Sequence, residues 1–334
     1  METKYTLGID ISKKKLNAAL TIDGKNYHEF EIENQTASIK KFFDELKSRI
    51  SSLNNLIVCT EHTGIYGMPL MELTVKKGIR ICVEPAKQIK LSLGMTRGKN
   101  DVVDARRIAA YAFKNRENLV FWVPQRECIQ RLKAMLTTRD RLVKVKTQLE
   151  VPLAEAGEFI SPAIRSEMKK HCRTSIDAVK KDIKKVERAI KELVKEDAIL
   201  SHQHDLATSI PGIGTIVACS VIIASGEFKR ISEPKKFACY AGVAPFEHSS
   251  GTSVRGKTRV SKMANMNIKK LLHLAATSAI TCNEELKVFY HRKVAEGKKK
   301  MSVISAVRNK LISRIYACVT HQRKYQKIYQ NALA

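Results

Sequence analysis

The sequence has few acidic residues for the number of its basic ones, and this shortage narrows the choice of partner. Its 334 residues include 60 Lys and Arg against 33 Asp and Glu, which gives a formal net charge of +27 at pH 7. A positive excess of this size is typical of proteins that bind a polyanion, and solubility alone does not require it. We therefore expect a nucleic acid partner, bound in a way that weakens steeply as salt rises.

Other common features are missing as well. The eight cysteines form no C-x-x-C pair and have no histidine at zinc-site spacing, which argues against a disulfide framework and a structural zinc. We interpret them as small buried side chains in a reducing compartment. The chain shows neither the charged and then apolar start of a secretory signal nor an apolar run that could span a bilayer. We therefore expect a cytoplasmic protein without membrane contacts.

The hydrophobic content, 44% of 334 residues, is enough for more than one folded core. In residues 1–124, short β-rich runs alternate with segments of helical periodicity. The expected strands are 5–11, 16–22, 27–32, 56–61 and 79–83, and the expected helices are 37–50 and 69–77. Three antiparallel strands, then alternating helix and strand, then an acidic helix, is the element order of the ribonuclease H-like fold. We predict an α/β domain of this type.

Four carboxylates fall where this fold would bring them to one edge of the sheet. Asp10 and Glu61 end two predicted strands, where ligands of α/β sheets gather. Asp101 and Asp104 lie three residues apart at the start of the next helix and share one helix face, although alone they could simply favour the helix dipole. Together the four acids predict a site for two divalent cations, Mg²⁺ or else Mn²⁺, that could clamp the attacking and leaving oxygens of an in-line phosphoryl transfer. Hydrolysis, strand transfer and nucleophilic attack by a side chain are all compatible with such a site.

Residues 125–200 are expected to form a helical connector. Lys, Arg, Glu and aliphatic residues dominate 125–149 and 164–200, with apolar residues three and four apart, as in paired long helices. The segment from Pro152 to Pro162 is the expected turn between them. The pattern fits a helical bundle packed within its own domain as well as it fits an intermolecular coiled coil.

Residues 201–334 are expected to form a mainly helical C-terminal domain. The run 209–214 leads into an apolar helix at 216–224, the form of a helix-hairpin-helix turn, in which backbone N–H groups near Gly212 and Gly214 face a DNA phosphate. Such a turn is a weak signal, because many loops contain one. The basic segment 287–330, with four interspersed tyrosines, fits either a nucleic-acid-binding surface or a purely structural helix pair.

In the segment 248–262, hydroxyl side chains occur among basic ones. One interpretation is a flexible basic loop that contacts phosphate. The other is a serine nucleophile whose developing charge is stabilised by neighbouring cations. The basic residues concerned are Arg255, Lys257, Arg259 and Lys262. The residue types alone favour the loop.

Five motifs, in the same order, resemble those of the DEDD transposases of the insertion-sequence one-ten family, which are similar to pilin-gene invertases. They are Gly8-Ile9-Asp10, the E-x-T-G-x-Y motif at 61–66, the R-x-K-x-D-x-x-D-A-R motif at 97–106, the S-I-P-G-I-G motif at 209–214 and the serine motif at 250–256. The resemblance covers nearly the whole chain. This chain differs from the family pattern at Met263-Ala264-Asn265, where many members have Arg-Gly-Asp. We therefore carry over no role for the acidic residue of that pattern.

The resemblance implies a RuvC-like domain at 1–124, a coiled-coil connector at 125–200 and a transposase domain at 201–334. In the first, Asp10, Glu61, Asp101 and Asp104 would hold Mg²⁺, and in the last Ser250 would be the nucleophile. Ser249 and Ser253 are near enough to be its rivals. The positions expected to contact nucleic acid are Arg97, Lys99, Arg106, Gly212, Gly214, Arg255, Lys257, Arg259 and Lys262.

The mechanism implied by the resemblance is recombination guided by a noncoding bridge RNA that pairs with donor and target DNA. Attack by Ser250 would give a phosphoserine link to DNA and a free 3′ hydroxyl, which would later reseal the DNA. Family members assemble as tetramers, through dimers, with the acids and the serine from different protomers. The alternative is a metal-dependent RuvC-like junction-resolving nuclease without a covalent intermediate, and a third interpretation is a non-catalytic nucleic-acid-binding protein.

Overall fold

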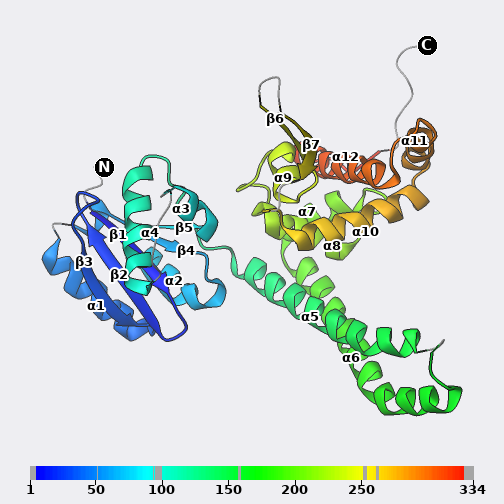
Figure 1. The fold of residues 1–334 in the computed structure, drawn as a ribbon, viewed down its shortest axis with the longest axis horizontal. Coiled ribbons are helices and arrows are strands. Elements are labelled where there is room, and N and C mark those ends of the chain that lie inside the picture. The colour runs from blue at the N-terminus through cyan, green and yellow to red at the C-terminus, as the bar shows by residue number, and fades with distance from the viewer. Residues whose placement is uncertain are drawn as a thin grey trace. The chain divides into compact units, whose positions relative to one another are not determined.

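The chain forms two compact units, residues 1–124 and 125–334 (Figure 1). The computed structural model describes residues 5–50, 52–92, 94, 100–156, 159–250, 254–260 and 263–326, with the backbone alone at 247–250, 254–255 and 257–259. Each unit has a hydrophobic core of its own. Four of the residues with predicted roles lie outside the described residues: Arg97, Lys99, Ser253 and Lys262.

A five-stranded mixed sheet forms the centre of the first unit. Its strands are β1 (Tyr5–Ile11), β2 (Lys15–Thr21), β3 (His28–Glu33), β4 (Leu56–Glu61) and β5 (Arg80–Glu84). Their order across the sheet is β3-β2-β1-β4-β5, antiparallel among β1, β2 and β3 and parallel from β1 to β4 and β5. This is the topology of the ribonuclease H-like fold, so the predicted fold class is confirmed.

Helices cover both faces of this sheet. They are α1 (Thr36–Arg49), α2 (Met68–Lys76), α3 (Ala86–Ser92) and α4 (Asp101–Asn115), with short 3₁₀ turns η1 (Leu53–Asn55) and η2 (Gly64–Gly67). Leu7 and Ile9 of β1 are completely buried on the face that α1 and α2 cover. Gly8 points to the opposite face, where a Cβ atom would collide with the backbone of Ala105 and Ala109 in α4. Only glycine permits so close an approach of strand and helix.

The helix α4 begins where the sequence predicts it to begin. The side-chain oxygen of Asn100 accepts a hydrogen bond from the backbone N–H of Val102 at 3.1 Å and so caps the helix. Asp101 and Asp104 both lie in its first turn, where a carboxylate favours the helix dipole.

The far end of α4 fixes its direction relative to the sheet. A Cβ atom on Gly24, in the turn between β2 and β3, would lie 2.6 Å from the ring of Phe113. That turn is beside the start of β1, because Thr21 of β2 pairs with Thr6. Since its C-terminal half lies over the start of β1, α4 runs antiparallel to that strand, and its N-terminus lies over the strand's carboxyl end.

In the second unit, α5 (Glu127–Glu155) and α6 (Pro162–Glu196) form a helical hairpin (Figure 1). The prediction that the first helix breaks at Pro152 is wrong, because α5 continues through Pro152 to Glu155. Proline removes one backbone hydrogen bond, and the helix tolerates this loss in its last turn.

The base of this hairpin is part of the C-terminal core. Leu132 of α5 and Ile190 of α6 pack with Cys219 in one buried cluster. Arg126, just before α5, donates to Asp197 Oδ2 at 2.6 Å and to Glu227 Oε1 at 2.5 Å. The hydrogen bonds from Arg126 and from the backbone N–H of Leu200 lower the pKa of Asp197 to about 2.

Six further helices complete the unit as described: α7 (Ala198–Thr208), α8 (Thr215–Ser225), α9 (Pro234–Tyr240), α10 (Met266–Cys282), α11 (Glu284–Ala295) and α12 (Lys300–Thr320). They enclose buried side chains such as Phe237, Leu272 and Leu311, which confirms a mainly helical C-terminal part. Within the described ranges, no helix combines the length and the apolar character that a bilayer crossing demands.

Candidate functional site

The two predicted strand acids lie side by side in the sheet. The parallel register of β1 and β4 pairs Ile9 with Thr60, so Asp10 and Glu61 follow in adjacent strands. Both share the sheet face of Gly8, because side chains alternate along a strand. This is the face that α4 covers.

The first turn of α4 lies over the same edge. Val102 and Asn17 line one small cavity of about 160 Å³, and Asn17 is the Cα partner of Asp10. Asp101 is exposed and lies one helical turn before Ala105, which contacts the sheet. The structure therefore brings Asp10, Glu61 and the start of α4 to one edge, as the sequence predicts.

The two other charged residues of α4 with predicted roles have partners in this structure. Asp104 accepts a hydrogen bond from Arg107 Nη1 at 2.8 Å, and both side chains are largely buried. Arg106, a predicted nucleic-acid contact, pairs with Glu29 on β3. Asp104 could bind a cation through the same oxygen only after its ion pair with Arg107 opens. Arg106 could bind a phosphate through the same nitrogen only after its ion pair with Glu29 opens.

A third strand acid on this face was not among the predicted site residues. Glu84 ends β5 and pairs in register with Glu61, so three acids lie at the carboxyl ends of the neighbouring strands β1, β4 and β5. Burial raises the pKa of the Glu84 carboxyl above its usual range. A strand that closes on an acid was the available signal, and it is the same signal that identified Asp10 and Glu61.

The donor atoms at this edge suit a hard divalent cation, because all are carboxylate oxygens. Among the residues that the structure describes, no three His, Cys, Asp or Glu side chains gather closely enough to form a metal site. Asp10, Glu61 and Asp101 thus fit the ion in donor type and in position on the fold, and binding requires their side chains to converge further.

The predicted nucleophile lies on a β-hairpin rather than in a flexible loop. Strands β6 (Pro245–Ser250) and β7 (Val254–Val260) pair antiparallel, with Ser250 opposite Val254 and Ser249 opposite Arg255. Ser250 is the last residue of its strand, at the tip of the hairpin. The predicted contacts Arg255, Lys257 and Arg259 all belong to β7. The residue pattern did not reveal this hairpin, because it lacks alternating apolar residues.

The predicted helix-hairpin-helix turn precedes α8. Gly212 has a φ of +90°, and a Cβ atom there would lie 2.5 Å from the Cβ atom of Ala279 in α10, so this glycine holds the turn against the core. Gly214 is the N-cap of α8, and nothing lies within 4 Å of the position of a Cβ atom. Of the two, Gly214 has room for a ligand at its backbone.

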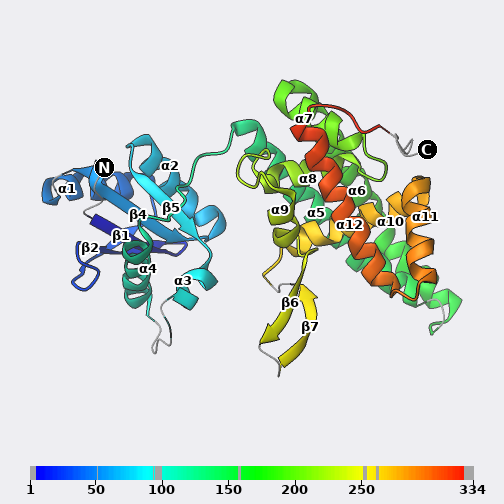
Figure 2. The ribbon, with the colours of Figure 1, turned by 90° about the horizontal axis from the view of Figure 1, so that it is seen from above.

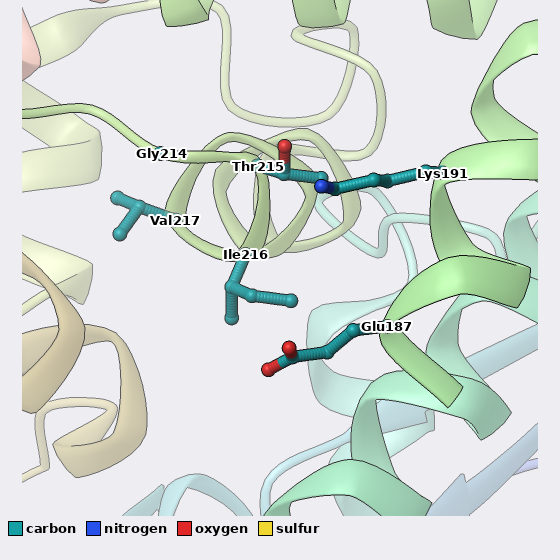
Figure 3. A pocket seen from close by; sticks show the side chains of 6 residues that line it. All are labelled: Glu187, Lys191, Gly214, Thr215, Ile216 and Val217. Atoms are coloured by element: carbon teal, nitrogen blue, oxygen red, sulfur yellow. The ribbon is translucent and has the colours of Figure 1, made fainter. Parts of the chain in front are cut away.

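A cavity of about 180 Å³ adjoins this helix start (Figure 3). Lys191 and Glu187 of α6 extend toward it, across from Thr215 and Ile216. The cavity therefore presents one cation and one anion beside the N-terminus of α8. This mixed charge is compatible with the predicted phosphate contact but does not specify it.

Comparison with known proteins bears on both units. Residues 7–156 match the transposase model of the IS110 DEDD type, and residues 204–291 match the transposase model of the IS116/IS110/IS902 family. The pilin gene-inverting protein of Moraxella bovis is 25% identical over 333 residues, covering 97% of this chain and 98% of that protein.

Two further similarities concern parts of the chain. The transposase for insertion sequence element IS1111A of Coxiella burnetii is 25% identical over 257 residues, with 68% of each chain covered. The structure of T. thermophilus RuvC in complex with a Holliday junction covers 35% of this chain and 99% of that one, at 13% identity and a TM-score of 0.30. With matches to family models in both units, the chain belongs to the IS110 family of transposases.

Proposed function

We propose that this transposase cuts and rejoins DNA through a covalent phosphoserine intermediate. The observation that carries the proposal is the placement of Asp10 and Glu61 in adjacent strands, under the acidic first turn of α4, in a chain whose C-terminal unit presents Ser250 at a hairpin tip. Acids at such an edge serve phosphoryl transfer, and the hydroxyl supplies a nucleophile.

Four residues of the first unit would hold the cation: Asp10, Glu61, Asp101 and Asp104. When bound, a divalent cation polarises the scissile phosphate and offsets charge that develops on its oxygens. Four carboxylates at one edge repel one another, so their convergence without a cation is unfavourable. A cation that all four carboxylates contact would offset this repulsion.

In the proposed first step, Ser250 Oγ attacks the scissile phosphorus and the bond from phosphorus to the 3′ oxygen breaks. The serine hydroxyl releases one proton and the leaving 3′ oxygen takes up one, so no net proton is consumed. In the return step, the 3′ hydroxyl of an exchanged strand attacks the phosphoserine and frees Ser250. One phosphodiester is made for each one broken, so the cycle needs no ATP.

The partners proposed with this mechanism are donor DNA, target DNA, a noncoding bridge RNA and further copies of the chain. The net charge of +27 supports binding of more than one nucleic acid strand. Because the acids and the serine belong to two separately folded units, we propose that protomers exchange them within a tetramer built from dimers. Mg²⁺ is the proposed cation, and Mn²⁺ is the alternative.

The decisive experiment detects the covalent link. The full-length protein is incubated with Mg²⁺, the transcript of the DNA that flanks its gene, and labelled DNA of that region. We expect a protein–DNA species that survives denaturant and maps by mass spectrometry to Ser250, and that Ser250→Ala abolishes while Ser249→Ala does not. Cleavage by Ser250→Ala without any adduct would contradict the proposal and support the junction-resolving nuclease.

A further inference from the structure

Arg308 is a buried cation that the proposed mechanism does not use. It lies in the middle of α12, which packs against α9, α10 and α11 (Figure 2), and its exposed fraction is 5%. Its neighbours on the helix, Val307, Leu311 and Ile312, belong to the hydrophobic core. Arginine is almost never buried this deeply unless a partner neutralises its charge.

In the described part of the chain, Arg308 has no acidic partner. One guanidinium nitrogen, Nη2, donates to Ser305 Oγ at 2.7 Å, and the buried Nε has no acceptor. Burial lowers the pKa of the guanidinium, with no carboxylate to oppose the effect. Since arginine stays protonated in proteins, the structure buries a charge that no carboxylate among the described residues offsets.

A second arginine of α12 differs from Arg308 in having an acidic partner. Arg314 Nη2 donates to both carboxylate oxygens of Glu285, each at 2.7 Å. Its guanidinium also stacks on the ring of Tyr325, 5.0 Å from the centroid. Glu285 thus neutralises the charge of Arg314, although the buried Nη1 of Arg314 has no acceptor, whereas Arg308, six residues earlier, has no carboxylate partner among the described residues.

The direction of the Arg308 side chain points to the ligand. Its bond to Ser305 directs the guanidinium toward the N-terminal end of α12, and Ser305 is only partly buried. That end begins with the exposed residues Lys299 and Lys300. A guanidinium without a carboxylate partner matches the oxygens of a phosphate better than any neutral ligand.

We propose that Arg308 binds a backbone phosphate of DNA and that this phosphate supplies the charge missing from its site. The segment matched by the family model ends at residue 291, so Arg308 lies beyond the region that the match describes. The inference rests on the proposed function only for the identity of the polyanion, DNA.

The test compares Arg308→Met with the matched control Arg314→Met, both in full-length protein carrying Ser250→Ala so that no strand is cut. Binding to duplex DNA is measured by fluorescence anisotropy over a salt titration from about 50 to about 300 mM. For Arg308→Met we expect a roughly tenfold weaker Kd, and a slope of log K against log salt smaller by about one. Arg314→Met should lower the Tm, because it leaves Glu285 unpaired, and should leave the salt slope unchanged.

Thermal unfolding separates ligand binding from a structural role. Removal of an uncompensated buried charge should leave the Tm of Arg308→Met equal to or above that of the parent. Inorganic phosphate should raise the Tm of the parent more than that of the variant. Unchanged DNA binding and salt slope, or a lower Tm with equal stabilisation by phosphate, would overturn the inference. Because binding is measured without cleavage, failure of the serine mechanism would not alter this outcome.

Discussion

The two halves of the proposed active site are held by structures of different kinds. Asp10 and Glu61 lie at the carboxyl ends of strands whose inner residues, such as Leu7 and Val58, are completely buried between two layers of helices. Among the described residues, β6, which ends at Ser250, pairs with β7 alone, and Phe246 on the same strand is half exposed. The acids are therefore positioned by a core, whereas the serine is carried on a hairpin that the core does not surround. Substitutions at Ser250 should therefore change activity without changing stability. Substitutions at Asp10 or Glu61 should be more prone to change both.

The largest effect should come from Ser250→Ala. Removal of the nucleophile should lower recombination at least about 10³-fold. The Tm should stay the same, because the hairpin contributes little to the core. Recombination assays paired with calorimetry measure both quantities, and Ser249→Ala is the matched control. A fall in Tm with Ser250→Ala would show that the hairpin contributes to the stability of the unit, contrary to this comparison.

Asp10→Asn should produce the next largest effect. Loss of one carboxylate should weaken Mn²⁺ binding, measured by isothermal titration calorimetry, and lower cleavage by about 10²-fold. Asp44→Asn is a suitable control, because Asp44 lies on α1, on the opposite face of the sheet, and pairs there with Lys77. Equal Mn²⁺ affinity in Asp10→Asn and the parent would show that the first unit's edge does not hold the cation.

Two glycine substitutions test whether the stability of each unit depends on the close backbone contact at its glycine. Gly8→Ala places a methyl group against the backbone of α4, and Gly212→Ala places one 2.5 Å from Ala279 at a positive φ. Each should cost about 2–3 kcal/mol, in the unfolding transition of its own unit only. Differential scanning calorimetry follows the two transitions. Gly214→Ala, with open space around it, should change stability by about 0.5 kcal/mol or less.

The smallest effect concerns the ion pair of Arg126 with Asp197. The pKa of Asp197 is lowered to about 2, so its contribution to stability is complete above its usual value near 4 and is lost as pH falls through 2. Asp197→Asn keeps the N-cap of α7 and should cost about 1 kcal/mol at pH 7, after solvent screening, and only a small part of that near pH 2, where half of the Asp197 carboxyls are protonated. Urea unfolding at both pH values measures this, with the exposed Asp205→Asn as control. An equal loss at both pH values would exclude the ion pair as the cause.

The sequence predicted the strands and helices whose positions depend on residues that are neighbours in the sequence. Strands β1 and β4 are apolar runs that end on an acid, and Asn100 with the acids after it marks the start of α4. Hairpin β6–β7 was missed because hydroxyl and basic residues fill it, and that composition is typical of a loop. The two strands are stabilised by pairing with each other, and the apolar periodicity of one segment does not report such pairing.

The site was predictable only to the level of residue type. Strand ends indicated Asp10 and Glu61, but the role of Glu84 beside them depends on the register of β4 and β5. The pairing of Arg106 with Glu29 joins residues far apart in the chain, and no local rule anticipates it. The same holds for Arg308, whose burial without a carboxylate is a property of the packed helices.

The contact at Gly8 has a consequence for how this protein can change. Strand and helix meet there through main-chain atoms, which are the same whatever side chains surround them. The separation of the two acid-bearing elements is thus independent of most substitutions in the neighbouring core. A chain built in this way can exchange much of its interior and still keep its carboxylates at one fixed spacing.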